Sequence, residues 1–293
     1  MKIEVAKYAG FCFGVKRAVQ LAFETARDSR NPVYTLGPII HNPEVVAELE
    51  RRGVKAVADP RGIRAGTVII RSHGVHPDVI AALKERGLLI IDATCPFVTK
   101  AQRAAAQLRD EGRQVVIVGE PHHPEVVALK GYAGPDSVIF NHQPVRTKPR
   151  IGVLSQTTVS EDDFVTALLA FGKRATDIHI FNTICNATQI RQRETMELAK
   201  RSDVMIVVGG RNSANTSRLA ELCKKVGKPT RSVETERELR AAWFKGACKV
   251  GVTAGASTPA ATVRRVVKRI RELTNTNAGD RERRRSFDRL PNH

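Results

Sequence analysis

The sequence predicts an α/β protein built of three related units with mostly parallel sheets. Two observations lead to this fold class. Apolar runs typical of strands alternate with helical patterns along nearly the whole chain. Cys12, Cys95 and Cys185 each stand where such a run ends and a helical pattern begins, and polar residues recur at matching distances after them.

Length and composition limit the class of protein. A chain of 293 residues with 42% hydrophobic and 27% charged residues is long enough for two or three units with buried cores. No run approaches the roughly 18 apolar residues of a membrane helix, and the start lacks the apolar core of a signal peptide. We therefore expect a cytoplasmic protein without a membrane segment. Five dispersed cysteines without a CxxC pair argue against a disulfide framework.

The first element of each copy is the junction at the cysteine. An apolar run leads into the cysteine, and an amphipathic helix follows it. These junctions occupy residues 8–26, 90–108 and 179–199. Because the same order of elements occurs three times, the cysteines are expected to occupy equivalent places.

The second and third strands follow each junction and end in small or polar residues. The second strands begin the stretches 32–49, 114–132 and 204–222. Their loops place a polar residue 28 or 29 positions after the cysteine: His41, His123 and Ser213. The third strands begin the stretches 66–83, 149–169 and 248–267. His73 and Gln156 both lie 61 positions after their cysteine, whereas Ser257 lies 72 after Cys185.

These repeats define the expected organisation. We predict three α/β units, at residues 1–95, 96–184 and 185–273, and a basic, disordered tail at 274–293. In open α/β sheets, ligands bind beyond the carboxyl ends of the strands. If the units pack around one axis, the three cysteines and the polar strand ends converge there.

Three thiols in a reducing compartment suggest either a zinc site or an iron–sulfur cluster. Structural zinc usually takes four ligands with paired local spacings, which this sequence lacks. A cubane cluster is held by thiolates and can leave one iron without a protein ligand. The helix after each cysteine would direct its N-terminus toward the centre and favour anionic thiolates.

The other strand-end residues suit a small anion such as phosphate, because they offer hydroxyl, amide and imidazole groups. They are His41, His73, His123, Thr157, Thr158, Ser213, Asn215 and Ser257. Glu125 is the carboxylate among them and is a candidate proton donor. It also reads as a first-turn helix residue, since Glu44 has the equivalent place in the first copy. Spacing does not separate the two roles.

At these residues the chain resembles the 4-hydroxy-3-methylbut-2-enyl diphosphate reductases of the methylerythritol phosphate pathway of isoprenoid synthesis. The resemblance extends from Lys7 to Leu273. Nine motifs occur in order: GFCFGVKRAV, LGPIIHNPEVV, RSHGV, DATCPFVTK, HHPEV, SQTTVS, NTICNATQIRQ, NSANTSRL and GVTAGASTP. The resemblance implies a trefoil around a [4Fe–4S] cluster held by Cys12, Cys95 and Cys185, with one open iron facing the substrate's hydroxyl.

The resemblance also implies the substrate site. Glu125 would deliver a proton to the leaving hydroxide. The diphosphate of the allylic substrate would bind among His41, His73, His123, Thr157, Ser213, Asn215 and Ser257. Ala214 replaces a serine that is frequent in the family, so only its backbone N–H is left to bind phosphate. Two electrons and two protons would yield isopentenyl and dimethylallyl diphosphate.

The positive charge of the chain bears on its expected partners and on two alternative functions. The family takes electrons from ferredoxin or flavodoxin, acidic proteins that match a net charge of +18. An iron–sulfur redox sensor is one alternative. A nucleic-acid-binding protein is another, favoured by charge but not by the 5% aromatic content. We expect a monomer or homodimer, and structural roles for Cys223 and Cys248.

Overall fold

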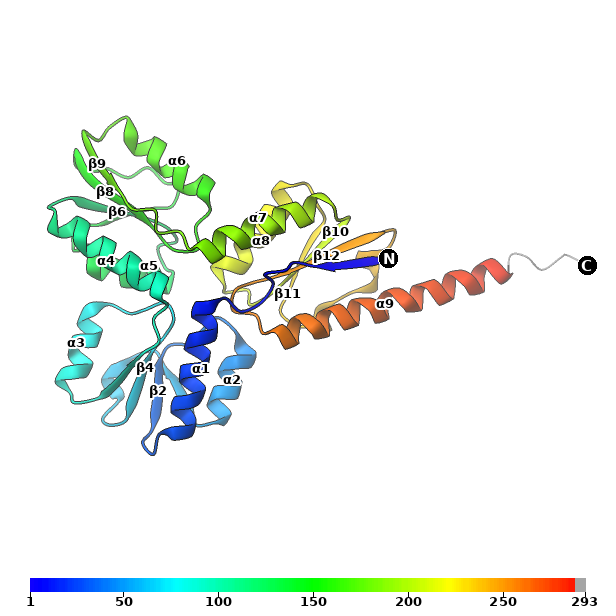
Figure 1. The fold of residues 1–293 in the computed structure, drawn as a ribbon, viewed down its shortest axis with the longest axis horizontal. Helices are drawn as coiled ribbons and strands as arrows, with labels where there is room; N and C mark the ends of the chain where they lie inside the picture. Colours follow the sequence, from blue (N-terminus) through cyan, green and yellow to red (C-terminus); the bar gives the residue numbers. More distant parts are fainter. Residues whose placement is uncertain (288–293) are drawn as a thin grey trace, which may run out of the picture. The chain divides into compact units, whose positions relative to one another are not determined.

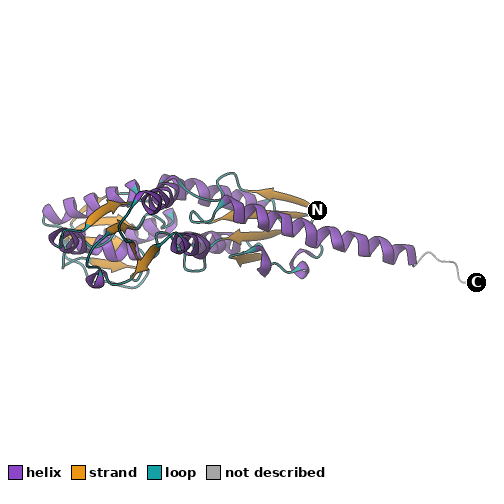
Figure 2. Ribbon diagram, turned by 90° about the horizontal axis from the view of Figure 1, so that it is seen from below, coloured by secondary structure: helices purple, strands orange, loops and turns teal. Residues whose placement is uncertain are grey.

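The computed structural model describes residues 1–287 of the 293-residue chain, and the side chains of residues 1–275. Within this range the strands form three four-stranded sheets, and all neighbouring strands in them are parallel. Helices accompany each sheet, as Figures 1 and 2 show. The apolar strands fit this setting, because parallel sheets are usually covered on both faces.

The first sheet has the strand order β3-β2-β4-β5. Its strands are β2 (Val33–Leu36), β3 (Val54–Val57), β4 (Thr67–Ile70) and β5 (Leu89–Asp92). The helices in this part of the chain are α1 (Phe13–Asp28), α2 (Pro43–Arg51) and α3 (Pro77–Glu85), with a short 3₁₀ helix η1 (Pro60–Gly62). Val68, Ile70 and Leu83 are at most 1% exposed and belong to one core cluster.

The second sheet repeats this plan in the order β7-β6-β8-β9. Its strands are β6 (Gln114–Val118), β7 (Val138–Phe140), β8 (Arg150–Ser155) and β9 (Asp177–Ile180). Its helices are α4 (Pro96–Asp110), α5 (Pro124–Ala133) and α6 (Glu161–Gly172). Leu108, Ile117 and Leu154 form the buried centre between α4 and the sheet. Helices α4 and α5 pack against each other.

The third sheet has the order β1-β12-β10-β11. Its strands are β1 (Lys2–Val5), β10 (Val204–Val208), β11 (Thr230–Val233) and β12 (Lys249–Ala254). The helices of this region are α7 (Asn186–Lys200), α8 (Ala214–Lys225) and α9 (Ala260–Phe287), with short 3₁₀ helices η2 (Glu236–Glu238) and η3 (Ala241–Phe244). Ile206, Val252 and Ile270 are fully buried in its core.

The first strand of the chain, β1, joins a different sheet from the strands that follow it in sequence. In the first two sheets, the edge strand beside the third strand of the copy leads into the next cysteine: β5 precedes Cys95 and β9 precedes Cys185. The strand before Cys12, β1, has no earlier sheet to join, and it pairs with β12 of the third sheet. This pairing satisfies a strand edge that would otherwise be open.

The chain divides into two compact units rather than the three expected from the repeats. One unit, Cys12–Ile190, contains the first and second sheets. The other contains the third sheet and consists of Met1–Phe11 and the chain from Arg191 onward. The three cysteines, the three strand-end histidines and Glu125 all lie in the first of these units.

The predicted tail also differs in the structure. A disordered segment was expected from residue 274, whereas α9 continues as a helix to Phe287. The segment is rich in arginine, which favours helices, and its first proline is Pro291. Residues 288–293 of the predicted tail lie outside the described residues. None of the helices within residues 1–287 is long and apolar enough to cross a membrane.

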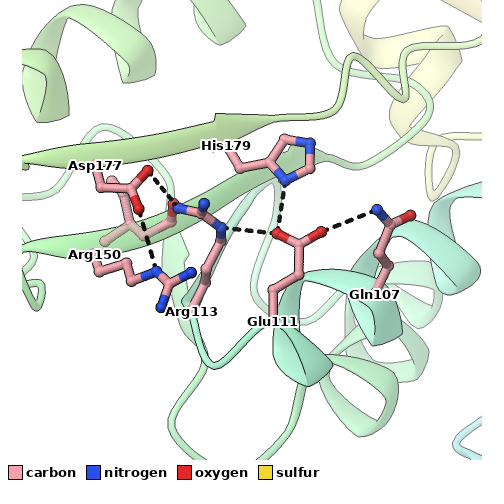
Figure 3. A network of polar contacts seen from close by, with 7 residues as sticks. Gln107, Glu111, Arg113, Arg150, Asp177 and His179 are labelled. Carbon is pink, nitrogen blue, oxygen red and sulfur yellow. Dashed lines mark hydrogen bonds and ion pairs between the residues drawn. The ribbon is translucent and has the colours of Figure 1, made fainter.

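A polar network braces the second sheet at the end where β8 and β9 begin (Figure 3). Glu111, just after α4, accepts hydrogen bonds from Arg113 at 2.8 Å and Gln107 at 3.0 Å, and its carboxylate lies 2.8 Å from His179 Nδ1. His179, Gln107 and Arg113 together lower the pKa of Glu111 to about 2. Asp177 pairs with Arg113 at 2.8 Å and with Arg150 at 3.2 Å. The network therefore has a structural role at the amino ends of these strands.

Candidate functional site

Polar residues at the carboxyl ends of the strands start the following helices. After β2, Asn42 caps α2 by accepting a hydrogen bond from the Val45 N–H at 3.0 Å. After β6, Nδ1 of His123 accepts one from the Glu125 N–H at 3.2 Å and caps α5. Both of these strands therefore end in a loop whose polar residue is fixed by the first turn of the next helix.

Three imidazoles come together in the unit Cys12–Ile190. His41 follows β2, His73 follows β4 and His123 follows β6. Their ring centroids lie 4.4 Å apart for His41 and His73, 5.8 Å for His41 and His123, and 5.6 Å for His73 and His123. Loops from two different sheets therefore supply one cluster, as expected for residues at the carboxyl ends of strands.

These imidazoles are neutral near pH 7. Burial, with the charges of His41 and Arg71, lowers the pKa of His123 to about 4. Burial also lowers the pKa of His41, and it places that of His73 well below its usual value. Because Nδ1 of His123 accepts a hydrogen bond, we assign the proton of this ring to Nε2. His123 thus offers an N–H donor.

Glu125 is buried in the same unit, with 2% of its surface exposed. One carboxylate oxygen accepts a hydrogen bond from the Thr157 N–H at 2.7 Å, and the other accepts one from the Thr157 hydroxyl at 2.9 Å. Burial raises the pKa of Glu125 to about 7, although both Thr157 bonds oppose the shift. Glu44, its counterpart in the first copy, is exposed. The two equivalent glutamates therefore differ in environment.

Each of the three cysteines lies at the start of a helix. Sγ of Cys12 accepts a hydrogen bond from the Val15 N–H at 3.5 Å. Burial raises the pKa of the Cys95 thiol to about 11, while the N–H groups of Phe97 and Val98 oppose the shift. Burial likewise raises the pKa of Cys185, opposed by backbone N–H groups of its own helix. These N–H groups favour the anionic form that binds metals.

The three thiols are neighbours, and their spacing differs from that around a single ion. Cys12 and Cys185 both act electrostatically on Cys95, and a Cβ added to Gly14, in the first turn of α1, would overlap Cys95 Sγ. Thiolates around one zinc lie about 3.8 Å apart. Among the described residues, however, no cysteine belongs to a group of three ligand atoms within 4.8 Å of one another. A cluster suits this wider spacing, because each thiolate binds a different iron.

Backbone hydrogen bonds connect two of the three cysteines to neighbouring loops. The Cys95 N–H donates to the carbonyl of Ser72, the residue before His73, at 3.0 Å. The Cys185 N–H donates to the carbonyl of Thr157 at 2.9 Å, and Thr157 also holds Glu125. Cys95 and Cys185 are thus linked to the loops that carry His73 and Thr157, the partner of Glu125.

Four predicted residues lie in the other unit, at the carboxyl ends of β10 and β12. Ser213 is 5% exposed and caps α8 by accepting a hydrogen bond from the Thr216 N–H at 3.4 Å. Ala214 is the half-buried first residue of α8, and Ser257 is 6% exposed after β12. Asn215 is 5% exposed, and both polar atoms of its amide are buried without a hydrogen-bond partner among the described residues. This amide is suited to binding a ligand.

The sequence reasoning missed Arg71, which follows β4 directly and acts electrostatically on all three imidazoles. A charged residue at the end of an apolar strand was the available signal. The two remaining cysteines differ from each other. Cys223 is fully buried in an apolar cluster, as a structural role requires, whereas Cys248 is exposed and packs in no core.

Comparison with curated proteins relates most of the chain to one family. A family model described as LytB protein matches residues 3–271. The 4-hydroxy-3-methylbut-2-enyl diphosphate reductase of Geobacter metallireducens is 47% identical over 277 residues, which cover 93% of this chain and 98% of the relative. The protein of the same name from Pelobacter propionicus is 48% identical over 281 residues, covering 94% and 100%.

Solved structures agree with this relationship. One, described as (E)-4-hydroxy-3-methyl-but-2-enyl diphosphate reductase, the terminal enzyme of the non-mevalonate pathway, has 42% identity and a TM-score of 0.68, and covers 93% of this chain and 100% of its own. The E-1-hydroxy-2-methyl-but-2-enyl-4-diphosphate reductase of Plasmodium falciparum has 26% identity and a TM-score of 0.85, covering 91% and 87%. The predicted α/β fold class is confirmed.

Proposed function

We propose, from the premise that this chain belongs to the LytB family, that it converts 4-hydroxy-3-methylbut-2-enyl diphosphate to isopentenyl and dimethylallyl diphosphate in the cytoplasm. The chain is an enzyme of that family, an oxidoreductase of isoprenoid synthesis. In the proposed reaction the allylic carbon–oxygen bond breaks. Two electrons and two protons enter, one proton joining the leaving hydroxide and the other forming the new carbon–hydrogen bond. The main support for the proposal is the buried acid Glu125, which is hydrogen-bonded to Thr157, whose carbonyl in turn accepts a hydrogen bond from the backbone N–H of Cys185.

Cys12, Cys95 and Cys185 would hold a [4Fe–4S] cluster. Their positions at three helix N-termini and their wider spacing support this choice over a single zinc ion. When bound, the cluster supplies electrons one at a time and an open iron for the substrate's hydroxyl oxygen. Because position 14 is a glycine, it has no side chain that would crowd the Cys95 thiol.

Each unit, taken by itself, offers groups suited to the diphosphate at its strand ends. In Cys12–Ile190, the imidazoles of His41, His73 and His123 would face the ligand as neutral groups, which cost less to bury than cations. The Thr157 hydroxyl, which donates to Glu125, would donate to the ligand only where the protonated Glu125 donates to it in turn. In the other unit, the groups offered are the hydroxyls of Ser213 and Ser257, the amide of Asn215 and the N–H of Ala214. The unpartnered amide of Asn215 supports this assignment.

Glu125 would donate the proton that lets hydroxide leave as water. Its pKa of about 7 keeps much of it protonated near neutral pH, which suits a general acid. Thr157 fixes both carboxyl oxygens and so orients the acid. Electrons would come from ferredoxin or flavodoxin, acidic proteins that the net charge of +18 would attract.

Replacing His73 by alanine is expected to weaken binding of inorganic diphosphate by about 1.5 to 3 kcal/mol, the usual range for a hydrogen bond to a charged group. Calorimetric titration of the anaerobically prepared chain measures this loss. His76→Ala is a matched control. His76 lies in the same loop as His73, but its side chain caps α3. Equal diphosphate affinity in the His73 variant and the wild-type chain would remove this imidazole from the pocket. Anaerobic turnover of the substrate tests the proposal as a whole.

A further inference from the structure

Arg71 is a half-buried cation without an anionic partner in the described part of the chain. Neither a hydrogen bond nor an ion pair of its guanidinium occurs among these residues, and its Nε is buried without a partner. Arg113 is different, since it pairs with Glu111 and Asp177 at 2.8 Å each. A buried cation left without a counter-charge is costly, so folded proteins rarely keep one without a use for it.

The guanidinium stays charged where it lies. Burial lowers the pKa of Arg71, and no carboxylate acts in the opposite direction. An arginine pKa starts above about 12, so the group is still a cation near neutral pH. Burial is the main cause of the lowered pKa values of His41, His73 and His123, and the charge of Arg71 adds to the shift of each.

Gly37 leaves the space that the Arg71 side chain occupies. This glycine follows β2 with φ +70°, and a Cβ added to it would lie 2.7 Å from a terminal nitrogen of Arg71. The guanidinium therefore lies over the carboxyl ends of β2 and β4, the strands whose loops carry His41 and His73. A side chain at position 37 would compete for this space and strain the backbone.

The three imidazoles beside Arg71 are poorly suited to binding a metal cation. The three imidazoles offer nitrogen atoms within 4.8 Å of one another, which alone would suit zinc. No carboxylate or thiol joins that group among the described residues, and Arg71 would repel a divalent ion beside it. An anion gains from Arg71 by attraction and from neutral imidazoles by hydrogen bonding.

We propose that Arg71 anchors the diphosphate of the substrate through a charge-assisted, two-pronged contact to one phosphate, beside the neutral imidazole donors. The inference rests on the function proposed above and adds a residue to it. A planar guanidinium matches two oxygens of one phosphate, whereas an imidazole offers a single donor. Arg71 thereby selects for the charge of the ligand, and the imidazoles orient it.

Titration of the full anaerobic chain with inorganic diphosphate tests this role through Arg71→Gln and Arg71→Lys. We expect the dissociation constant to rise roughly 10- to 100-fold in Arg71→Gln. The rise should be smaller in Arg71→Lys, which keeps the charge but loses the planar pair of donors. The substrate KM should rise with it while kcat changes little. Added sodium chloride should weaken binding more in the wild-type chain than in Arg71→Gln.

Arg64→Gln is the matched control, because it removes an exposed arginine just before β4 and should bind diphosphate as the wild-type chain does. A wild-type dissociation constant in folded Arg71→Gln overturns the inference, and so does an unchanged constant in Arg71→Lys if only that variant folds. If His73→Ala loses affinity while Arg71→Gln does not, only the role of Arg71 fails. If neither variant loses affinity, the proposed pocket fails as well.

Discussion

Cys95→Ser is expected to lose most of its iron and nearly all turnover. Serine keeps the size of the side chain but replaces a soft thiolate with a hydroxyl that binds iron poorly and stays protonated. Cys95 also packs against Gly14 at the start of α1, so the position admits little rearrangement. Iron and acid-labile sulfide per chain after anaerobic purification measure the loss, together with turnover of the diphosphate substrate. Cys12→Ser and Cys185→Ser should behave in the same way.

The two remaining cysteines provide the controls. Cys248 is exposed, and its backbone N–H rather than its thiol holds Asp203 at 2.8 Å, so Cys248→Ser should retain both iron and activity. Cys223 is fully buried among apolar residues, so Cys223→Ser should lower the thermal midpoint while leaving the iron content intact. Full iron content and normal turnover in Cys95→Ser would exclude this thiol as a ligand.

Glu125→Gln is expected to reduce turnover strongly while the cluster and diphosphate affinity persist. Glutamine keeps the shape and can still accept a hydrogen bond from the Thr157 N–H, but it has no acidic proton to deliver. In the wild-type chain, the protonated fraction of Glu125 falls as the pH rises through its pKa of about 7. With a chemical reductant in excess, kcat should therefore decline above about pH 7, and the residual activity of Glu125→Gln should lack this decline.

Glu44→Gln separates catalysis from a role at the start of a helix. Both glutamates lie in the first turn of a helix after an equivalent strand, α2 for Glu44 and α5 for Glu125. A purely local contribution of charge to the helix predicts similar, small losses of stability in the two variants. Proton delivery predicts a loss of turnover at Glu125 alone. Comparable turnover in both variants would leave Glu125 as a structural residue.

The sequence was most informative about what repeats. The regular distances from Cys12, Cys95 and Cys185 predicted three parallel sheets and the loops that end their strands, because a repeated pattern specifies a repeated local structure. The same regularity misplaced β1. A repeat shows which strands are equivalent, but β1 pairs with β12 because of how the ends of the chain meet, which depends on the tertiary fold.

Burial was the property that the sequence could not supply. Glu44 and Glu125 look alike in sequence, but only Glu125 receives both hydrogen bonds from Thr157, 32 residues further along the chain. Arg71 escaped notice for a related reason. Most arginines are exposed or paired, and only the assembled loops after β2, β4 and β6 show that Arg71 has no partner among the described residues.

Product analysis of anaerobic turnover is the most direct test of the central claim, which is reduction of the allylic diphosphate at a site held by three thiols and supplied with a proton by Glu125. The purified chain, with its iron content determined, is incubated with 4-hydroxy-3-methylbut-2-enyl diphosphate and a reductant, and the diphosphates are separated. We expect both isopentenyl and dimethylallyl diphosphate, with two electrons consumed for each molecule formed. Recovery of unchanged substrate from a chain that carries its full iron and binds diphosphate would contradict the central claim.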